Sequence, residues 1–420
     1  MTHRRSIHPV RPFILSLMLL LLVAAPACAG FRLMGSVGGQ GYGYEDAEEQ
    51  DHLWMIGSGS FSLIQTGGPW SVHYGSSFLK DNISGSDVTE DPEDLLLLRK
   101  AYLQYGRIGS PVQVKAGRFF LARGVALGVL DGMDVSYALN SRVRLSGFVG
   151  MAGAMSREYE FDGFDQAMSY GAEVKLVPSK CLLPAKGMLA LSYVQTQRDK
   201  ETIRNLFGVQ TYHKFIDMPL TWMNNLQLRP TGNPFRKWIS RLRYQTHSVN
   251  LMAELGVIGF DVANYSWFSD FEAPARARVR LVGDYYFVPG KWAAGAEIQT
   301  LLSGFRMGPV VTTPWGQAGY RLSSGDYGVT SGPWVNAHYA VSPCLELYAF
   351  AQMMSYEWDA FDIETQDLTS VLYGGRLTPK FMPSMTASLQ VQVYTTPELS
   401  YDQRILGGLT WRFDTGRTGR

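Results

Sequence analysis

Beyond its first 29 residues, the sequence lacks long hydrophobic runs. No later apolar stretch approaches the roughly 18 residues that mark a membrane-spanning helix, and helix-period patterns are scarce. Cysteine is also rare: of 3 in the chain, only Cys181 and Cys344 follow residue 29. Two cysteines cannot build a disulfide scaffold or a metal site made of thiolates. The composition therefore excludes a helical membrane protein and a small disulfide-stabilised domain.

An excess of charge of either sign is missing too. With 38 Lys and Arg against 37 Asp and Glu, the formal net charge is +1. A near-neutral chain offers no global attraction for nucleic acid. Catalytic motifs are also missing: there is no Gly-x-Ser-x-Gly, no Cys-x-x-Cys-His and no His-x-x-x-His, and no helix follows the glycine-rich stretch 35–43. We predict that the chain is not an enzyme, binds no cofactor or metal, and has no nucleic acid partner.

The first 29 residues have the pattern of a secretory signal peptide. Arg4, Arg5 and Arg11 carry positive charge, residues 13–25 are mostly apolar, and Ala27-Cys28-Ala29 matches the small-x-small cleavage pattern. The apolar segment is shorter than the ~20 residues that a spanning helix needs. We therefore expect residues 1–29 to direct export from the cytoplasm and to be removed. Their removal would change the formal net charge to −2.

Long alternations of apolar and polar residues occupy the rest of the chain. In 275–288, Val279, Leu281 and Tyr285 alternate with Arg278 and Arg280. The segments 142–152, 384–395 and 405–413 show the same period of two, which is the period of a β-strand, and 187–197 shows it less cleanly split. Strands in soluble proteins average about 5–6 residues, whereas a tilted strand needs ~9–11 residues to cross a bilayer. The lengths of these runs favour an all-β, transmembrane, antiparallel up-and-down barrel.

Short turn signals alternate with longer polar stretches. The turns lie at 67–69, 109–111, 140–141, 178–184, 230–234, 289–290, 342–343 and 382–383, and the long stretches at 81–94, 156–166, 262–274, 323–332 and 357–367. Short periplasmic turns and long outer loops are typical of outer-membrane barrels. The turns divide the chain into hairpins that predict about 18 strands, within a range of 16–20. We expect one barrel domain over 30–413 and a short C-terminal tail over 414–420.

Two segments resemble known outer-membrane proteins. Gly407, Leu409, Trp411 and Phe413 resemble the β-signal that the barrel-assembly machinery recognises, although seven residues follow Phe413 here and the aromatic residue usually ends the chain. The run 98–132, with Arg99 to Tyr105, Ala116-Gly117-Arg118 and Leu130-Asp131-Gly132, is similar to porin-like and alginate-export-like barrels. These resemblances imply a Gram-negative outer-membrane location, contact with lipid and lipopolysaccharide, and assembly by that machinery.

Basic residues recur at the polar positions of the predicted strands. They are Arg142, Arg144, Arg241, Arg243, Arg276, Arg278, Arg280, Lys100, Lys115 and Lys175. Arginine on the lipid face at the bilayer midplane costs ~2–4 kcal/mol, so we expect these side chains to line the lumen. Rows of cations would favour anions. Alternatively, pairing with Glu173, Asp284 and Glu297 would neutralise them and stiffen the wall. Arg118 lies at an apolar position, which indicates a bulge or a strand end.

These patterns predict a porin-like outer-membrane channel for small hydrophilic solutes, including anionic ones, with an arginine-lined lumen. Two other functions remain open. One is a barrel that houses or anchors an envelope complex, such as a porin–cytochrome electron conduit; the other is export of an anionic polysaccharide. The partners that we consider are two further copies of the chain, in a homotrimer, or a periplasmic or cytochrome partner.

Overall fold

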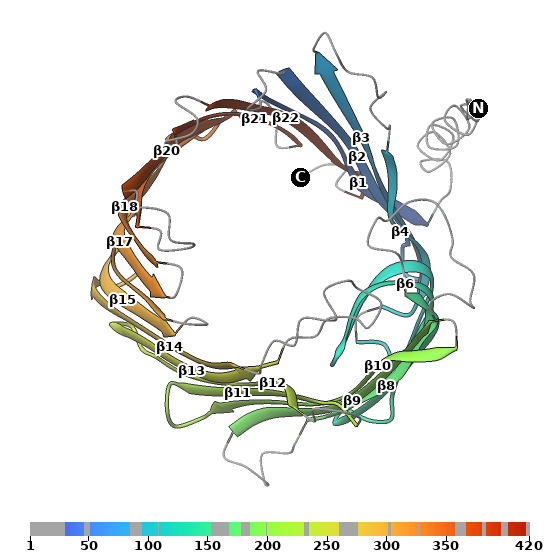
Figure 1. Ribbon diagram of the computed structural model, residues 1–420. Helices are drawn as coiled ribbons and strands as arrows, with labels where there is room; N and C mark the ends of the chain where they lie inside the picture. Colours follow the sequence, from blue (N-terminus) through green and yellow to red (C-terminus); the bar gives the residue numbers. More distant parts are fainter. Residues whose placement is uncertain are drawn as a thin grey trace.

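The chain forms one closed sheet of 22 antiparallel strands, seen end-on as a ring in the computed structural model (Figure 1). The structure describes residues 30–45, 51–84, 95–107, 109–152, 168–177, 185–198, 200–230, 235–259, 276–300, 304–325, 328–357, 367–379, 384–395 and 402–416. Consecutive strands pair along the chain, and the last strand, β22, pairs with the first, β1, from Met34↔Asp414 to Gly43↔Ile405. The predicted all-β, up-and-down transmembrane barrel is thereby confirmed.

The strands are β1 (Phe31–Glu45), β2 (Asp51–Gln65), β3 (Trp70–Ser84), β4 (Leu95–Tyr105), β5 (Val112–Arg123), β6 (Ala126–Ala138), β7 (Val143–Ala152), β8 (Met168–Leu176), β9 (Ala185–Arg198), β10 (Glu201–Phe215), β11 (Leu220–Leu228), β12 (Phe235–Gln245), β13 (Val249–Ile258), β14 (Arg276–Val288), β15 (Trp292–Thr300), β16 (Phe305–Thr313), β17 (Gly316–Gly325), β18 (Gly328–Ser342), β19 (Leu345–Glu357), β20 (Asp367–Pro379), β21 (Met385–Thr395) and β22 (Asp402–Asp414). The expected signal peptide, 1–29, and the expected loops 156–166 and 262–274 lie outside the described residues.

Within the described ranges, no helix is long and apolar enough to span a membrane.

The prediction of 18 strands was wrong, because the turn signals were assigned incompletely. Seven of the eight lie between an even-numbered strand and the next odd-numbered one, at the end of the barrel that holds the start of β1. The signal at 230–234 instead joins β11 to β12 at the opposite end. Turns at 216–219, 246–248 and 314–315 were missed, and the segment 323–332, expected to be a loop, is mostly strand in β17 and β18.

One missed turn has no glycine or proline to mark it. In 246–248, the Thr246 hydroxyl accepts hydrogen bonds from the backbone N–H groups of Ser248 and Val249, at 3.3 and 3.0 Å. A threonine side chain here closes the turn that glycine or proline would otherwise favour. Composition alone therefore gives a weak signal at this position.

The closing strand β22 has the two faces that its sequence predicts. Ile405, Leu409 and Trp411 are 47%, 45% and 45% exposed on the outer face, as expected for side chains that meet lipid. The ring of Phe413 lies 5.2 Å from that of Trp411, between centroids. A Cβ at Gly35 on β1 would lie 2.6 Å from both the Phe413 ring and the Ser60 carbonyl oxygen, so only glycine fits at this position. Recognition of the four β-signal residues by the assembly machinery remains a prediction.

An ion pair also joins the first and last strands at the closing seam. β22 extends to Asp414, whose carboxylate accepts hydrogen bonds from Arg32 Nε and Nη2, at 2.7 and 2.5 Å. The next residue, Thr415, accepts a hydrogen bond from the Leu33 backbone N–H at 2.9 Å. The first and last strands are thus joined by side chains as well as by their backbone ladder.

Strand β14 offers a test of the two faces. Leu281 lies near its centre and is 47% exposed, and the next residue, Val282, lies opposite Glu297 of β15. We expect Leu281→Arg to lower the free energy of unfolding in lipid vesicles by about 2–4 kcal/mol, because it places a cation in hydrocarbon. The matched change Val282→Arg should cost less than about 1 kcal/mol, because its cation meets Glu297 and water. Urea unfolding followed by tryptophan fluorescence measures both, and equal losses would contradict the assignment of faces.

Candidate functional site

The hairpin of β5 and β6 leaves the barrel wall partway along its length and folds into the lumen (Figure 1). β5 pairs with β4 only from Ala101↔Arg118 to Tyr105↔Val114, whereas its ladder with β6 continues to Arg123↔Ala126. On the other side, the described pairing of β6 with β7 begins at Leu130↔Ala152. Residues 119–129, which we call the inner hairpin, therefore have no ladder partner in the described wall.

Glycines allow the close strand approach at the base of the inner hairpin. Gly117 and Gly132 lie directly opposite each other in the ladder, and Gly117 has a φ of +119°. A Cβ at Gly117 would lie 2.2 Å from the carbonyl oxygen of Ala101, and one at Gly132 would lie 2.2 Å from that of Val149. Only glycine fits such positions without moving the backbone.

Apolar side chains hold the inner hairpin against the wall. Phe119, Leu121 and Leu130 are 1%, 5% and 2% exposed. They form one cluster with Phe148, Val194 and Leu206 of strands β7, β9 and β10. Full burial of each such side chain contributes about 1.5–3 kcal/mol. Burial of this size keeps the hairpin docked on the inner face of the wall.

The tip of the hairpin is fixed by hydrogen bonds to β9 and β10. The Val125 N–H donates to the Ser192 hydroxyl at 3.2 Å, and Arg204 Nη2 donates to the Val125 carbonyl at 3.3 Å. Gln210 Nε2 donates to the Gly124 carbonyl, also at 3.3 Å. These contacts assign the even-numbered residues of β9, and those of β10 from Arg204 onward, to the inner face, which is the face that the hairpin covers.

A buried ion pair marks the point where β5 leaves β4. Arg118 Nε and Nη2 donate to the two carboxylate oxygens of Asp131, both at 2.6 Å, and the two residues are 4% and 9% exposed. Arg118 Nη1 also donates to the backbone carbonyl of Leu98 on β4 at 3.3 Å. The guanidinium thus satisfies a wall carbonyl at the point where the backbone of β5 has turned away.

A second set of charges lies along the inner hairpin. Arg123 Nε and Nη2 donate to the Asp134 carboxylate at 3.1 and 2.8 Å, and Arg123 Nη1 lies 3.9 Å from Glu173. Lys175 Nζ lies 3.0 Å from the same Glu173 carboxylate, which is 2% exposed. Because these carboxylates are nearly buried, they depend on the cations beside them. Lys175, a predicted lumen residue, is therefore paired.

Carboxylates also pair with several of the predicted lumen arginines. Arg241 Nη2 and Arg278 Nε lie 2.5 and 3.3 Å from the two oxygens of Glu254, which is 1% exposed. Arg280 Nε donates to Glu297 at 2.7 Å. One shared carboxylate thus links β12, β13 and β14, and sequence reasoning missed Glu254 because its partners come from two other strands.

The remaining predicted residues lie in different settings. Arg243 Nε donates to the Asn250 side chain at 2.9 Å, and Arg144 Nη1 lies 3.4 Å from the Ser136 hydroxyl. Arg276 is the first residue of β14, opposite Ile258. Arg142 lies in the exposed turn between β6 and β7, so it belongs to no strand face.

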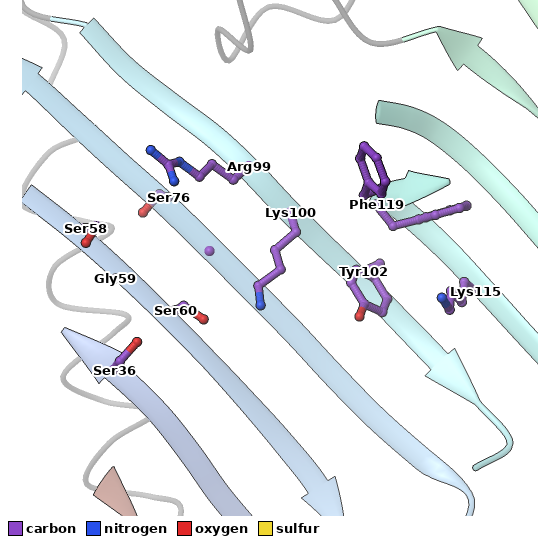
Figure 2. A pocket seen from close by; sticks show the side chains of 12 residues that line it. Ser36, Ser58, Gly59, Ser60, Ser76, Arg99, Lys100, Tyr102, Lys115 and Phe119 are labelled. Carbon is purple, nitrogen blue, oxygen red and sulfur yellow. The ribbon is translucent and has the colours of Figure 1, made fainter. Parts of the chain in front are cut away.

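Lys100 and Lys115 differ from Arg241, Arg278, Arg280 and Lys175, which pair with carboxylates. Neither has a carboxylate within ion-pair distance in the part of the chain that the structure describes. Both line a cavity of about 410 Å³ between the β1–β4 wall and the base of the inner hairpin (Figure 2). Its lining residues are Ser36, Ser58, Gly59, Ser60, Gly75, Ser76, Arg99, Lys100, Tyr102, Lys115, Phe119 and Phe120. No Asp or Glu is among them.

A second cavity, of about 650 Å³, shares Lys115 with the first and is lined by residues of the β2–β3 and β4–β5 turns. Arg32 and Arg107 also line the second cavity, where the Arg32 guanidinium is paired with Asp414 of the closing seam. Lys115 Nζ also lies 5.8 and 5.9 Å from the ring centres of Tyr102 and Phe119, within cation–π range. Lys100 and Lys115 therefore line cavities without a lining carboxylate, whereas Arg241, Arg278 and Arg280 over β12–β14 pair with carboxylates.

Sequence reasoning missed Arg99 as part of this site. Gly75 pairs with Lys100 while Ser76 pairs with Leu98, so Arg99 is the extra residue of a β-bulge. The bulge allows the consecutive residues Arg99 and Lys100 to line the same cavity. An arginine and a lysine side by side in an alternating strand are a signal that could have indicated it.

Across the described strands and turns, no three His, Cys, Asp or Glu residues gather into a group that could hold a metal ion.

Comparisons with known proteins find similarity in structure alone. No protein-family model and no curated protein matches the sequence. The P pilus usher PapC translocation pore superposes with a TM-score of 0.51 at 8% identity, covering 91% of this chain and 99% of that one. OccAB4 of Acinetobacter baumannii gives 0.43 at 8% identity, covering 92% and 98%, and OpdK of Pseudomonas aeruginosa with vanillate gives 0.41 at 10%, covering 91% and 98%. The chain thus has the fold of an outer-membrane β-barrel.

The ion pair at the base of the inner hairpin gives a prediction. Asp131→Asn leaves the buried Arg118 guanidinium without its counter-charge, which costs about 3–5 kcal/mol in comparable sites. We expect backbone amides of residues 119–129 to exchange with deuterium at least roughly a hundredfold faster, because the hairpin undocks more often. Mass spectrometry of the barrel in lipid nanodiscs measures this exchange.

The matched control removes both charges. Arg118→Leu with Asp131→Leu leaves no unpaired charge, so most of the protection should return. Amides of β18, on another part of the wall, should not change in either variant. Unchanged exchange in Asp131→Asn would show that apolar packing alone fixes the hairpin.

Proposed function

We propose that the chain is an outer-membrane channel that passes small hydrophilic solutes and prefers anions. One observation carries the proposal: charged side chains on the inner face remain accessible to solvent. The side chains of Arg241, Lys175, Arg280 and Glu297 are 39%, 32%, 30% and 33% exposed, although each takes part in an ion pair. Partly exposed charges are what a water-filled lumen favours, because a packed interior would exclude them.

The preference for anions is supported by the uneven pairing of charge. Over β12–β15, Glu254 and Glu297 offset much of the arginine charge. Over β1–β5, Lys100 and Lys115 line cavities that have no lining carboxylate. Unopposed cations along a solute path lower the energy of a passing anion and raise that of a cation. Selectivity would therefore come from the lysines more than from the arginine rows that the sequence suggested.

The inner hairpin supports a constricted path rather than a uniform pore. It covers the wall at β7, β9 and β10. Its other face exposes Phe120 and Leu127, which are 57% and 67% exposed. Solutes would pass between this face and the lysine-bearing wall of β1–β4. The sheath and polysaccharide-exporter alternatives have no such specific support and remain predictions.

The proposal predicts the ion selectivity of the purified barrel in a planar bilayer. Under a KCl gradient, the reversal potential should show chloride preferred over potassium. Lys100→Gln with Lys115→Gln should lower the permeability ratio roughly two- to fivefold, because two unopposed cations are lost. The charge-preserving control, Lys100→Arg with Lys115→Arg, should keep the wild-type ratio.

The outcomes separate the parts of the proposal. If the folded barrel carries no current, it is not a channel, and the sheath alternative gains support. If current flows but the glutamine variant keeps the wild-type reversal potential, these lysines do not set the selectivity.

A further inference from the structure

The strand edge beside the lysine cavity is incompletely paired. β4 extends over Leu95–Tyr105, but β5 pairs only with its residues 101–105. With five residue pairs, this is the shortest ladder between neighbouring strands in the described barrel. Over 95–100, the described partner of β4 is β3 alone. A bilayer provides no hydrogen bonds for a free strand edge, so an incompletely paired edge is rare in a barrel wall.

This incomplete pairing coincides with the place where the inner hairpin turns inward. Arg118 supplies a donor to the Leu98 carbonyl on that edge, at 3.3 Å. The cavity of about 410 Å³ lies at the same point, because Arg99 and Lys100 of β4 line it together with Phe119 and Phe120 of β5. One site therefore joins the charged inner wall, the apolar base of the hairpin and the β4 residues that do not pair with β5 in the described barrel.

The lining of the cavity changes in polarity from one side to the other. Figure 2 shows Ser36, Ser58 and Ser60 on one side of Lys100, and Tyr102 and Phe119 near Lys115 on the other. Next to them, Phe120 is 57% exposed in spite of its apolar ring. A small inorganic anion would use the cations and hydroxyls but would leave this ring uncovered. An apolar group attached to the anion would cover it.

We propose that this cavity binds a small amphipathic anion, namely a carboxylate or phosphate joined to an apolar group. The charged head lies between Lys100 and Lys115, and the apolar part lies against the exposed ring of Phe120, beside residues 95–100 of β4, whose described strand partner is β3 alone. This inference rests on the proposed channel function and narrows its solute class.

Octanoate and acetate are suitable probes, because they share a carboxylate and differ in the apolar chain. The mature barrel in lipid nanodiscs is dialysed to equilibrium with labelled octanoate, against empty nanodiscs of the same lipid. We expect saturable binding above the empty-disc level, and acetate should compete at least tenfold more weakly. Only non-saturable uptake would mean partition into lipid, and equal competition by acetate would mean that charge alone is recognised. Either result overturns the proposal.

Variants assign the two parts of the ligand to residues. Lys100→Gln and Lys115→Gln should each weaken octanoate binding at least tenfold, and Lys100→Arg should restore most of it. Phe120→Ser should weaken octanoate binding and leave acetate competition unchanged. The matched control is Lys237→Gln on β12, outside the cavity, which should bind as the wild type does. Equal binding by Lys100→Gln and Lys237→Gln contradicts the site, provided that both variants show the heat-modifiable gel migration of a folded barrel.

The same preparation separates this inference from the channel proposal. A barrel that conducts ions but shows no saturable octanoate binding remains a channel without this site. A barrel that binds octanoate through Lys100 but carries no current keeps the site and contradicts the channel.

Discussion

A β-sheet in a bilayer must satisfy its own backbone, and the pairing of β22 with β1 is the step that makes this possible. Water is absent from the hydrocarbon, so a free N–H or carbonyl there costs several kcal/mol. Closure from Met34↔Asp414 to Gly43↔Ile405 removes both edges of the sheet. It also gives every strand one lipid face and one lumen face. The exposed ring of Trp411 and the buried carboxylate of Glu254 are therefore consequences of one geometric condition.

The inner hairpin is the place where the described wall departs from this condition, and its structure compensates for the departure. β5 turns inward at Gly117, and this turn separates it from residues 95–100 of β4. Arg118 then spans the two, because it binds Asp131 of its own hairpin and the Leu98 carbonyl of the wall. The apolar cluster under Phe119 and Leu130 supplies the burial that keeps the hairpin in place. The inner hairpin, which narrows the lumen, is thus stabilised mainly by its contacts with the inner faces of β7, β9 and β10.

Sequence patterning predicted the fold and the orientation of β22, because two solvents impose a period of two. The pattern was misleading where lumen-facing side chains are buried under the inner hairpin, which is neither lipid nor water. In 187–197 the alternation was ambiguous, and the structure gives the reason: Ala190 and Val194 face inward and are buried, at 0% and 1% exposure, with Val194 packed in the apolar cluster that the inner hairpin completes. The sequence shows that Arg118 occupies an apolar position of its strand, and it shows the Asp131-Gly132 pair. Their meeting across a ladder could not be seen, because pairing between strands depends on register. One of the three missed turns has a local reason, since Thr246 closes it with its side chain, whereas the other two contain Pro219 and Pro314 and were simply not recognised.

Charge on the lumen wall follows from pairing rather than from composition. Arg241 and Arg278 share the single carboxylate of Glu254, so this trio keeps one positive charge, with its guanidinium groups fixed across three strands. Lys100 and Lys115 have no such partner in the described chain and line open cavities. A fixed ion pair stiffens a wall and presents a weak field, whereas an unopposed ammonium attracts an anion and can follow it as it passes. Arg241, Arg278 and Arg280 are therefore structural ties between strands, and Lys100 and Lys115 are the cations that a solute would meet in the proposed channel.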